Sequence, residues 1–127
     1  MQGKSLFEYA AIRLVPKVER EEFLNVGVVL YCASAQFLQC RFFLDEKRLL
    51  AFSSDLDLVQ IKENLQAFAK ICHGTLDSGP IGQLDLPSRF RWLTATRSTV
   101  LQVSKVHPGF CEAPEKCLEN LLEDLVL

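Results

Sequence analysis

The sequence predicts an α+β fold: an antiparallel sheet of about four strands in the order βββ-α-β-α, with helices packed on it. Two observations predict this fold. The first 44 residues hold three strand-length segments rich in apolar and β-branched side chains. Residues 58–72 and 118–125 instead carry an apolar side chain at every third or fourth position, the spacing of one helix face. At 127 residues, the chain is predicted to form a single domain, residues 1–127.

The sheet is predicted from three segments, residues 7–15, 26–32 and 36–44. Apolar residues alternate along the first segment until Pro16, which has no amide proton for a strand ladder. The second segment is apolar on both faces and is therefore placed at the centre. Residues 33–35 are short enough for a hairpin turn. Residues 17–25 are highly charged and too long for a tight turn, so we expect a structured loop with one helical turn; a merely solvated connection is the alternative.

The clearest predicted helix starts near residue 58 and ends before Gly74. Asp55 or Asp57 can cap its start by accepting an amide hydrogen bond, and Gly74 suits the left-handed residue that follows a helix. Its apolar stripe consists of Leu58, Ile61, Leu65, Phe68 and Cys72. The stripe predicts that this helix packs on one face of the sheet.

The rest of the chain predicts shorter elements. Residues 79–82 are expected to form a turn, and Pro87 suits the first position of a short helix at residues 88–93. A fourth strand is predicted at residues 99–104, closed by residues 107–109. A last helix is predicted from Pro114 to the terminus. Five cysteines without a C-x-x-C pair, and no targeting or membrane segment, favour reduced thiols in a cytoplasmic protein.

Charge is unevenly distributed along the chain. The net charge of −2 argues against a simple nucleic-acid binder, which needs a globally basic domain. Residues 86–111 nevertheless contain four basic and no acidic residues, whereas residues 112–127 contain five acidic residues and one lysine. One interpretation is that the acidic last helix lies beside the basic segment and neutralises it.

The other interpretation is an anion site built on the basic segment. Arginine presents a planar fork of donors that meets phosphate or carboxylate with two hydrogen bonds, hydroxyls add donors, and an indole offers a stacking face. The residues of this predicted site are Arg89, Arg91, Trp92, Arg97, Ser98 and Thr99.

Signals for metal chemistry are weaker, and we expect no cofactor. His107, Cys111 and Cys117 match no common zinc spacing and lack a fourth ligand. Cys72 and His73 could form a thiolate pair, but Cys72 falls on the apolar helix stripe, which favours a place in the core. The glutamates of residues 19–22 could hold Mg²⁺ for phosphodiester chemistry.

Two blocks of the sequence resemble an uncharacterised bacterial family, domain of unknown function 3037. The first block is EYAAIRLVP followed by VEREEFLNVGV, residues 8–16 and 18–28. The second is GPIG, RFRWLT, RST and VHPG, within residues 79–109. The family has no established activity. The resemblance implies a role as an accessory or regulatory partner of a serine/threonine kinase of the high-persistence toxin type.

The resemblance also implies a set of functional polar residues. To the basic segment it adds, from the first block, Arg13, Glu19, Arg20, Glu22 and Asn25. We expect both groups to meet at one edge of the sheet, with Arg13 beneath them and paired with a loop carboxylate, because a buried unpaired charge is costly.

Two functions are compatible with this set. The first is a binding or regulatory module for a phosphorylated molecule, a nucleic-acid end or an acidic partner surface. The alternative is a small metal-dependent enzyme acting on phosphate esters or nucleic acid, with a loop glutamate as base or metal ligand and the arginines as electrostatic clamps. A third interpretation is purely structural, with the charged residues holding the fold together through ion pairs.

Overall fold

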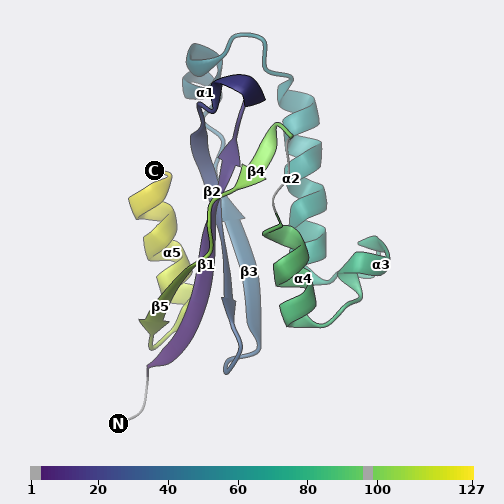
Figure 1. Cartoon of the computed structure of the whole chain (residues 1–127), viewed down its shortest axis with the longest axis vertical. Helices are drawn as coiled ribbons and strands as arrows, with labels where there is room; N and C mark the ends of the chain where they lie inside the picture. Colours follow the sequence, from purple (N-terminus) through teal and green to yellow (C-terminus); the bar gives the residue numbers. More distant parts are fainter. Residues whose placement is uncertain (1–3, 96–98) are drawn as a thin grey trace.

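A computed structural model describes residues 4–95 and 99–127 and confirms the α+β fold. Its antiparallel sheet has the order β3-β2-β1-β4, and β5 also pairs with β1 (Figure 1). The strands are β1 (Ser5–Leu14), β2 (Leu24–Cys32), β3 (Phe37–Phe42), β4 (Leu101–Val103) and β5 (His107–Cys111). The three predicted N-terminal strands are confirmed, and the apolar β2 lies inside the sheet.

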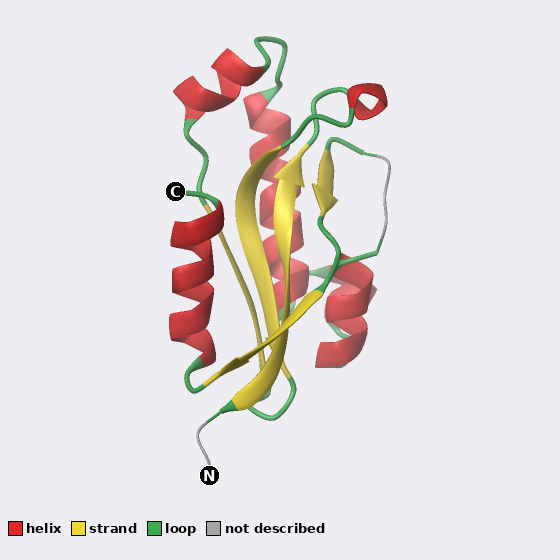
Figure 2. Cartoon of the chain, turned by 60° about the vertical axis from the view of Figure 1, so that its left-hand side comes forward, coloured by secondary structure: helices red, strands yellow, loops and turns green. Residues whose placement is uncertain are grey.

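Helices cover both faces of this sheet (Figures 1 and 2). One core lies between the sheet and helices α1, α2 and α4, and a second lies between the sheet and α5. The helices are α1 (Glu46–Phe52), α2 (Leu58–His73), α3 (Gly79–Gly82), α4 (Leu86–Leu93) and α5 (Pro114–Leu125), with a 3-10 turn η1 (Val18–Arg20). Among the described residues, no helix has both the length and the apolarity needed to cross a membrane.

Helix α2 forms as its sequence predicts. Ile61, Leu65, Phe68 and Cys72 are buried. Asp57 caps the first turn by accepting a hydrogen bond from the Gln60 amide. Gly74 adopts the left-handed conformation after the last turn, with φ at 67°. This helix therefore spans the face of the sheet as one rigid element, and its two ends lie far apart along the sheet (Figure 1).

The outer edge of β1 differs from the prediction. The single strand expected at residues 99–104 is shorter, and a further strand, β5, pairs with the first half of β1. Between the two, the Ser104 amide donates to the Ala11 carbonyl and the Ser104 hydroxyl accepts from the Ala11 amide, each at 2.9 Å. Gly109 is needed in β5 because a Cβ there would lie 2.6 Å from the Phe7 ring.

Two helices were not predicted. Helix α1 follows Asp45, whose carboxylate caps it by accepting from the Arg48 amide. Helix α3 occupies the segment expected to be a turn. The predicted neutralisation of the basic segment by the last helix is wrong for Arg89 and Arg91, because α5 and α4 lie on opposite faces of the sheet.

Candidate functional site

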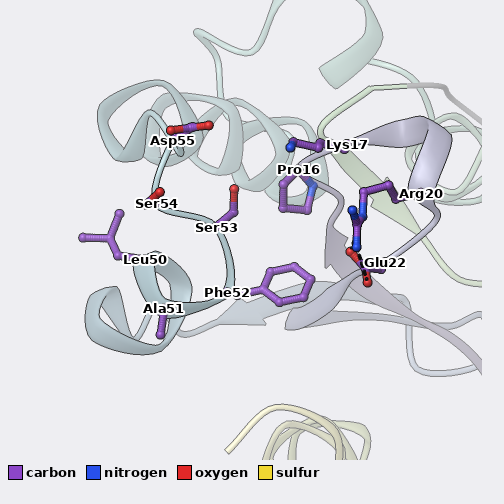
Figure 3. A pocket seen from close by; sticks show the side chains of 10 residues that line it. All are labelled: Pro16, Lys17, Arg20, Glu22, Leu50, Ala51, Phe52, Ser53, Ser54 and Asp55. Atoms are coloured by element: carbon purple, nitrogen blue, oxygen red, sulfur yellow. Dashed lines mark hydrogen bonds and ion pairs between the residues drawn. The ribbon is translucent and has the colours of Figure 1, made fainter.

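A pocket of about 370 Å³ lies where the loop after β1 faces the end of α1 and the connection between α1 and α2 (Figure 3). Side chains from both of these segments surround it. They are Pro16, Lys17, Arg20 and Glu22 on one side and Leu50, Ala51, Phe52, Ser53, Ser54 and Asp55 on the other. We call this the polar pocket.

The first wall of the polar pocket is the predicted helical turn. Residues 18–20 form η1, and Glu21 closes it in the left-handed conformation with φ at 56°. This turn brings Arg20 and Glu22 together: Arg20 Nε donates to Glu22 Oε1 at 2.8 Å, and Arg20 Nη2 donates to Glu22 Oε2 at 3.2 Å. These hydrogen bonds and the adjacent charge hold the pKa of Glu22 below its usual range and raise the pKa of Arg20. Both side chains remain more than half exposed.

The second wall supplies hydroxyl groups and one carboxylate. Helix α1 ends at Phe52, and the chain continues through Ser53, Ser54 and Asp55 before α2 begins. Lys17 extends its amine toward this wall (Figure 3). Among the described residues, no carboxylate lies within ion-pair distance of Lys17. Within the described part of the chain, the pocket thus offers a lysine that makes no direct ion pair but whose charge acts on Glu22, and an arginine that Glu22 already holds.

Arg13 and Asn25 do not belong to the polar pocket. The predicted pairing of Arg13 with a loop carboxylate is wrong: its guanidinium carbon instead lies 3.9 Å from the centre of the Phe23 ring. Asn25 donates through Nδ2 to the Leu125 carbonyl at 3.2 Å, so its side chain faces the end of α5. Arg13 Nε and Asn25 Oδ1 are buried and have no hydrogen-bond partner among the described residues.

The arginines of α4 lie at the far end of α2. Arg89 donates from Nη1 to the Leu84 carbonyl at 2.7 Å. Its guanidinium sits so close to Gly74 that a Cβ at Gly74 would lie 3.1 Å from it. Gly74 follows the end of α2, whereas Asp55 of the polar pocket precedes its start. A helix of 16 residues is about 24 Å long. The expectation that Arg20 and Arg89 share one pocket is therefore wrong.

The remaining predicted residues are dispersed. Glu19 is an exposed residue of η1, and Arg91 is exposed on α4. Trp92 and Thr99 line a separate, more apolar pocket of about 300 Å³ between α2, α4 and β4. Arg97 and Ser98 lie outside the described residues.

Residues that sequence reasoning did not place in the site are Lys17, Ser53 and Ser54. The signal for them is modest: a lysine directly after the strand-ending Pro16, and a Ser-Ser-Asp run between two helices. Which loops face each other depends on how α1 packs, and α1 was not predicted.

Within the described residues, one group of three possible metal ligands is found, Cys40, Cys72 and His73. Their ligand atoms all lie within 4.8 Å of one another. Burial and the neighbouring Arg41 and Arg89 charges lower the pKa of His73. The glutamates of residues 19–22 form no such group, and neither do His107, Cys111 and Cys117.

Comparison with known proteins identifies one family. The sequence model of a family described as a protein of unknown function, DUF3037, matches residues 9–126. No curated protein and no solved structure matches the chain. The match covers both loops of the polar pocket and all three residues of the cysteine and histidine group.

Proposed function

The chain belongs to the DUF3037 family, and we propose that it is a binding module that takes an anionic group of a ligand or partner in the polar pocket. The observation that supports this is the placement of Lys17, Arg20 and the hydroxyls of Ser53 and Ser54 around a single cavity. A phosphoryl group or a carboxylate is the natural ligand for such donors, because hydrogen bonds between ionised partners are the strong ones.

The two cations have different roles in this proposal. Among the described residues, Lys17 makes no direct ion pair with a carboxylate, so its amine is available to an incoming anion. Arg20 is held in a fork by Glu22. An anion that binds beside Arg20 must compete with Glu22 for the guanidinium. Glu22 therefore selects for strongly charged ligands. A singly charged anion leaves the Arg20–Glu22 pair intact, whereas a doubly charged phosphoryl group interacts strongly enough with Arg20 to displace the Glu22 carboxylate.

Binding is favoured over catalysis by the chemistry of the lining. Neither histidine nor cysteine occurs among the described residues that line the pocket. The carboxylate best placed to act as a base, Glu22, has a lowered pKa and therefore little tendency to take a proton at neutral pH. Serine hydroxyls without an adjacent base are suited to donate hydrogen bonds to a ligand rather than to attack it.

Isothermal titration with inorganic phosphate and with phosphoserine, at low ionic strength, tests the proposal. We expect Lys17→Ala to weaken phosphate binding about tenfold, the size expected for one charge-assisted hydrogen bond. Lys105→Ala removes the same charge from an exposed lysine outside the pocket and should leave the affinity unchanged. Equal losses in the two variants would indicate a general charge effect, and no binding by the unmodified protein would refute the proposal.

A second variant addresses the competition at Arg20. Glu22→Gln removes the competing carboxylate charge while keeping an oxygen acceptor, so phosphate binding should tighten by up to about fivefold. The metal-dependent enzyme predicts a different result. Incubation with RNA, DNA and nucleotides plus Mg²⁺ or Mn²⁺ would then show turnover that Glu22→Gln abolishes.

The family resemblance implies a toxin-type serine/threonine kinase as a partner. A phosphorylated residue of such a kinase is one source of the anionic group that would bind in the polar pocket. Co-purification from the native host, with the unmodified protein and with Lys17→Ala in parallel, tests this. A kinase recovered with both proteins would bind elsewhere on the surface, and one recovered only with the unmodified protein would use the polar pocket.

A further inference from the structure

Cysteines and a histidine gather at the end of α2 that is remote from the polar pocket. Cys40 comes from β3, and Cys72 and His73 come from the last turn of α2. Two of the three are firmly fixed, since Cys72 is completely buried and Cys40 is 4% exposed. His73 is exposed. Two soft sulfur ligands are therefore held in place by the core, and an exposed imidazole lies within 4.8 Å of them.

We propose that Cys40, Cys72 and His73 form a binding site for a Zn²⁺ ion, with a fourth coordination position open to water on the His73 side. Zinc takes thiolate and imidazole ligands in tetrahedral geometry, with bonds of about 2.3 Å to sulfur and about 2.0 Å to nitrogen. The three ligand atoms lie within 4.8 Å of one another, so a single ion between them is within reach of all three side chains.

The protons and charges of the site balance. Each thiol loses a proton as its sulfur bonds to the metal, so Zn²⁺ binding releases two protons in all. Two thiolates, one neutral imidazole and one Zn²⁺ carry no net charge. His73 is suited to the neutral role, since burial and the nearby arginines disfavour its charged form.

Charged groups from each neighbouring element act on the site. Arg41 of β3 and Arg89 of α4 add to burial in disfavouring the charged form of His73. A hydrogen bond with Cys40 and burial raise the pKa of the Cys72 thiol, and Arg89 offsets this only in part. The metal ion itself must therefore replace the thiol protons. The C-terminal end of α2 carries the negative end of the helix dipole, which favours a cation there. A metal ion whose charge is cancelled by two thiolates adds no net charge beside the two arginines.

The other three cysteines lie on the opposite face of the sheet and provide an internal comparison. Cys32 and Cys111 are buried in the core beneath α5, with Cys117 of α5 packed against it. Burial raises the pKa of Cys111 to about 12. Among the described residues, this trio is not brought together as a group of metal ligands. Cys117, which is only partly buried, is therefore a suitable control position.

Cobalt substitution tests the proposal on the full chain, kept reduced and first stripped of metal. Titration with Co²⁺ should give the thiolate-to-cobalt charge-transfer band and the strong visible bands of tetrahedral Co²⁺, saturating at one ion per chain. Zn²⁺ should then displace Co²⁺ and remove these bands. Absence of the thiolate band in the reduced protein would overturn the proposal.

Three variants locate the ion. Cys40→Ser leaves Cys72 as the single thiolate ligand, so the thiolate band should fall to about half or less at saturation. His73→Ala changes an exposed side chain, so the protein should stay folded by circular dichroism while Zn²⁺ affinity falls by more than about 100-fold, since even outer partners of a metal site are worth about 10- to 100-fold. Cys117→Ser should bind as the unmodified protein does. An unchanged band in Cys40→Ser, an unchanged affinity in His73→Ala, or a loss in Cys117→Ser would each refute the assignment.

Discussion

The polar groups at the two ends of α2 differ in their exposure to solvent. At the first end, the charges of the polar pocket stand on loops, and the Arg20–Glu22 pair is more than half exposed on both sides. At the last end, two thiols are buried against β3, and Arg89 covers the glycine that follows the helix. Charges in water contribute little to folding and can be rearranged by a ligand, whereas buried groups are fixed by the fold. One helix thus carries an adaptable end and a rigid end.

The way each end is closed reinforces this difference. The first turn is capped by the carboxylate of Asp57, a side chain that other polar residues can replace. The last turn is closed by the Gly74 amide, which bonds to the carbonyls of Lys70 and Ile71 from a left-handed backbone. That conformation favours glycine, and the space beside it is filled by Arg89. Sequence change is therefore tolerated at the first end and resisted at the last.

The largest effect is expected from a substitution that removes the common support of both ends. Leu65 lies in the middle of α2 and is completely buried. Leu65→Ala should destabilise the protein by about 2–5 kcal/mol through lost burial and a cavity, measured by urea unfolding. Phosphate and Co²⁺ binding should weaken together at denaturant concentrations where the variant unfolds.

The control for this prediction lies on the same helix. Val59 is 70% exposed, so Val59→Ala should change stability by less than about 0.5 kcal/mol. If Leu65→Ala abolished binding at one end of α2 while leaving the other intact at the same urea concentration, the two ends would belong to independently folding parts of the protein.

Much of this fold follows from periodicity in the sequence. The stripe from Ile61 to Cys72 predicts α2, and alternating or continuous apolar runs predict β1 to β3. Strand β5 carries no such pattern, because Pro108 and Gly109 occupy its middle. It is a strand because β1 offers a free edge over Ser5–Tyr9, and the proline can be accommodated at an edge. Its conformation is set by a tertiary partner that local sequence does not encode.

The candidate sites also depend on tertiary packing that the local sequence does not encode. The Arg20–Glu22 contact is local and lies in a loop that sequence reasoning had already marked as functional. The cysteine group joins positions 32 residues apart in the chain, Cys40 and Cys72. Cys72 lies on the predicted helix stripe and Cys40 in a predicted strand, but their meeting depends on how far α2 is shifted along β3. The prediction that Arg20 and Arg89 share a pocket is wrong for the same reason. Local sequence does not indicate which end of α2 each arginine lies beside.

A smaller effect, confined to the rigid end, is expected from Gly74→Ala. The left-handed backbone costs alanine about 1–2 kcal/mol, and the new methyl group must displace the Arg89 guanidinium. Co²⁺ binding at Cys72 and His73 should weaken, while phosphate binding in the polar pocket should not change. Thermal unfolding and the two titrations measure these outcomes.

Gly79 provides a matched control for this substitution. It has a similar left-handed backbone, with φ at 79°, but a Cβ there meets no atom within 4 Å. Gly79→Ala should therefore cost only the backbone strain and spare Co²⁺ binding. If the two alanine variants behaved alike in the cobalt titration, the contact between Arg89 and the end of α2 would have no influence on the metal site.

The smallest effect is expected from the adaptable end when pH is varied. Arg20 lowers the pKa of Glu22 in the folded chain, so the pair stabilises folding above the ordinary glutamate pKa of 4.5, and this contribution is lost as pH falls through the lowered value. The pair is exposed, so the melting temperatures of the unmodified protein and Glu22→Gln should differ only slightly at neutral pH. The difference should vanish in acid and shrink in high salt.

If Glu22→Gln lowered the melting temperature as much as Gly74→Ala does, the Arg20–Glu22 pair would be part of the packed core. The two ends of α2 would then not differ in rigidity. A near-zero difference, combined with tighter phosphate binding, would show that Glu22 acts on the ligand rather than on the fold.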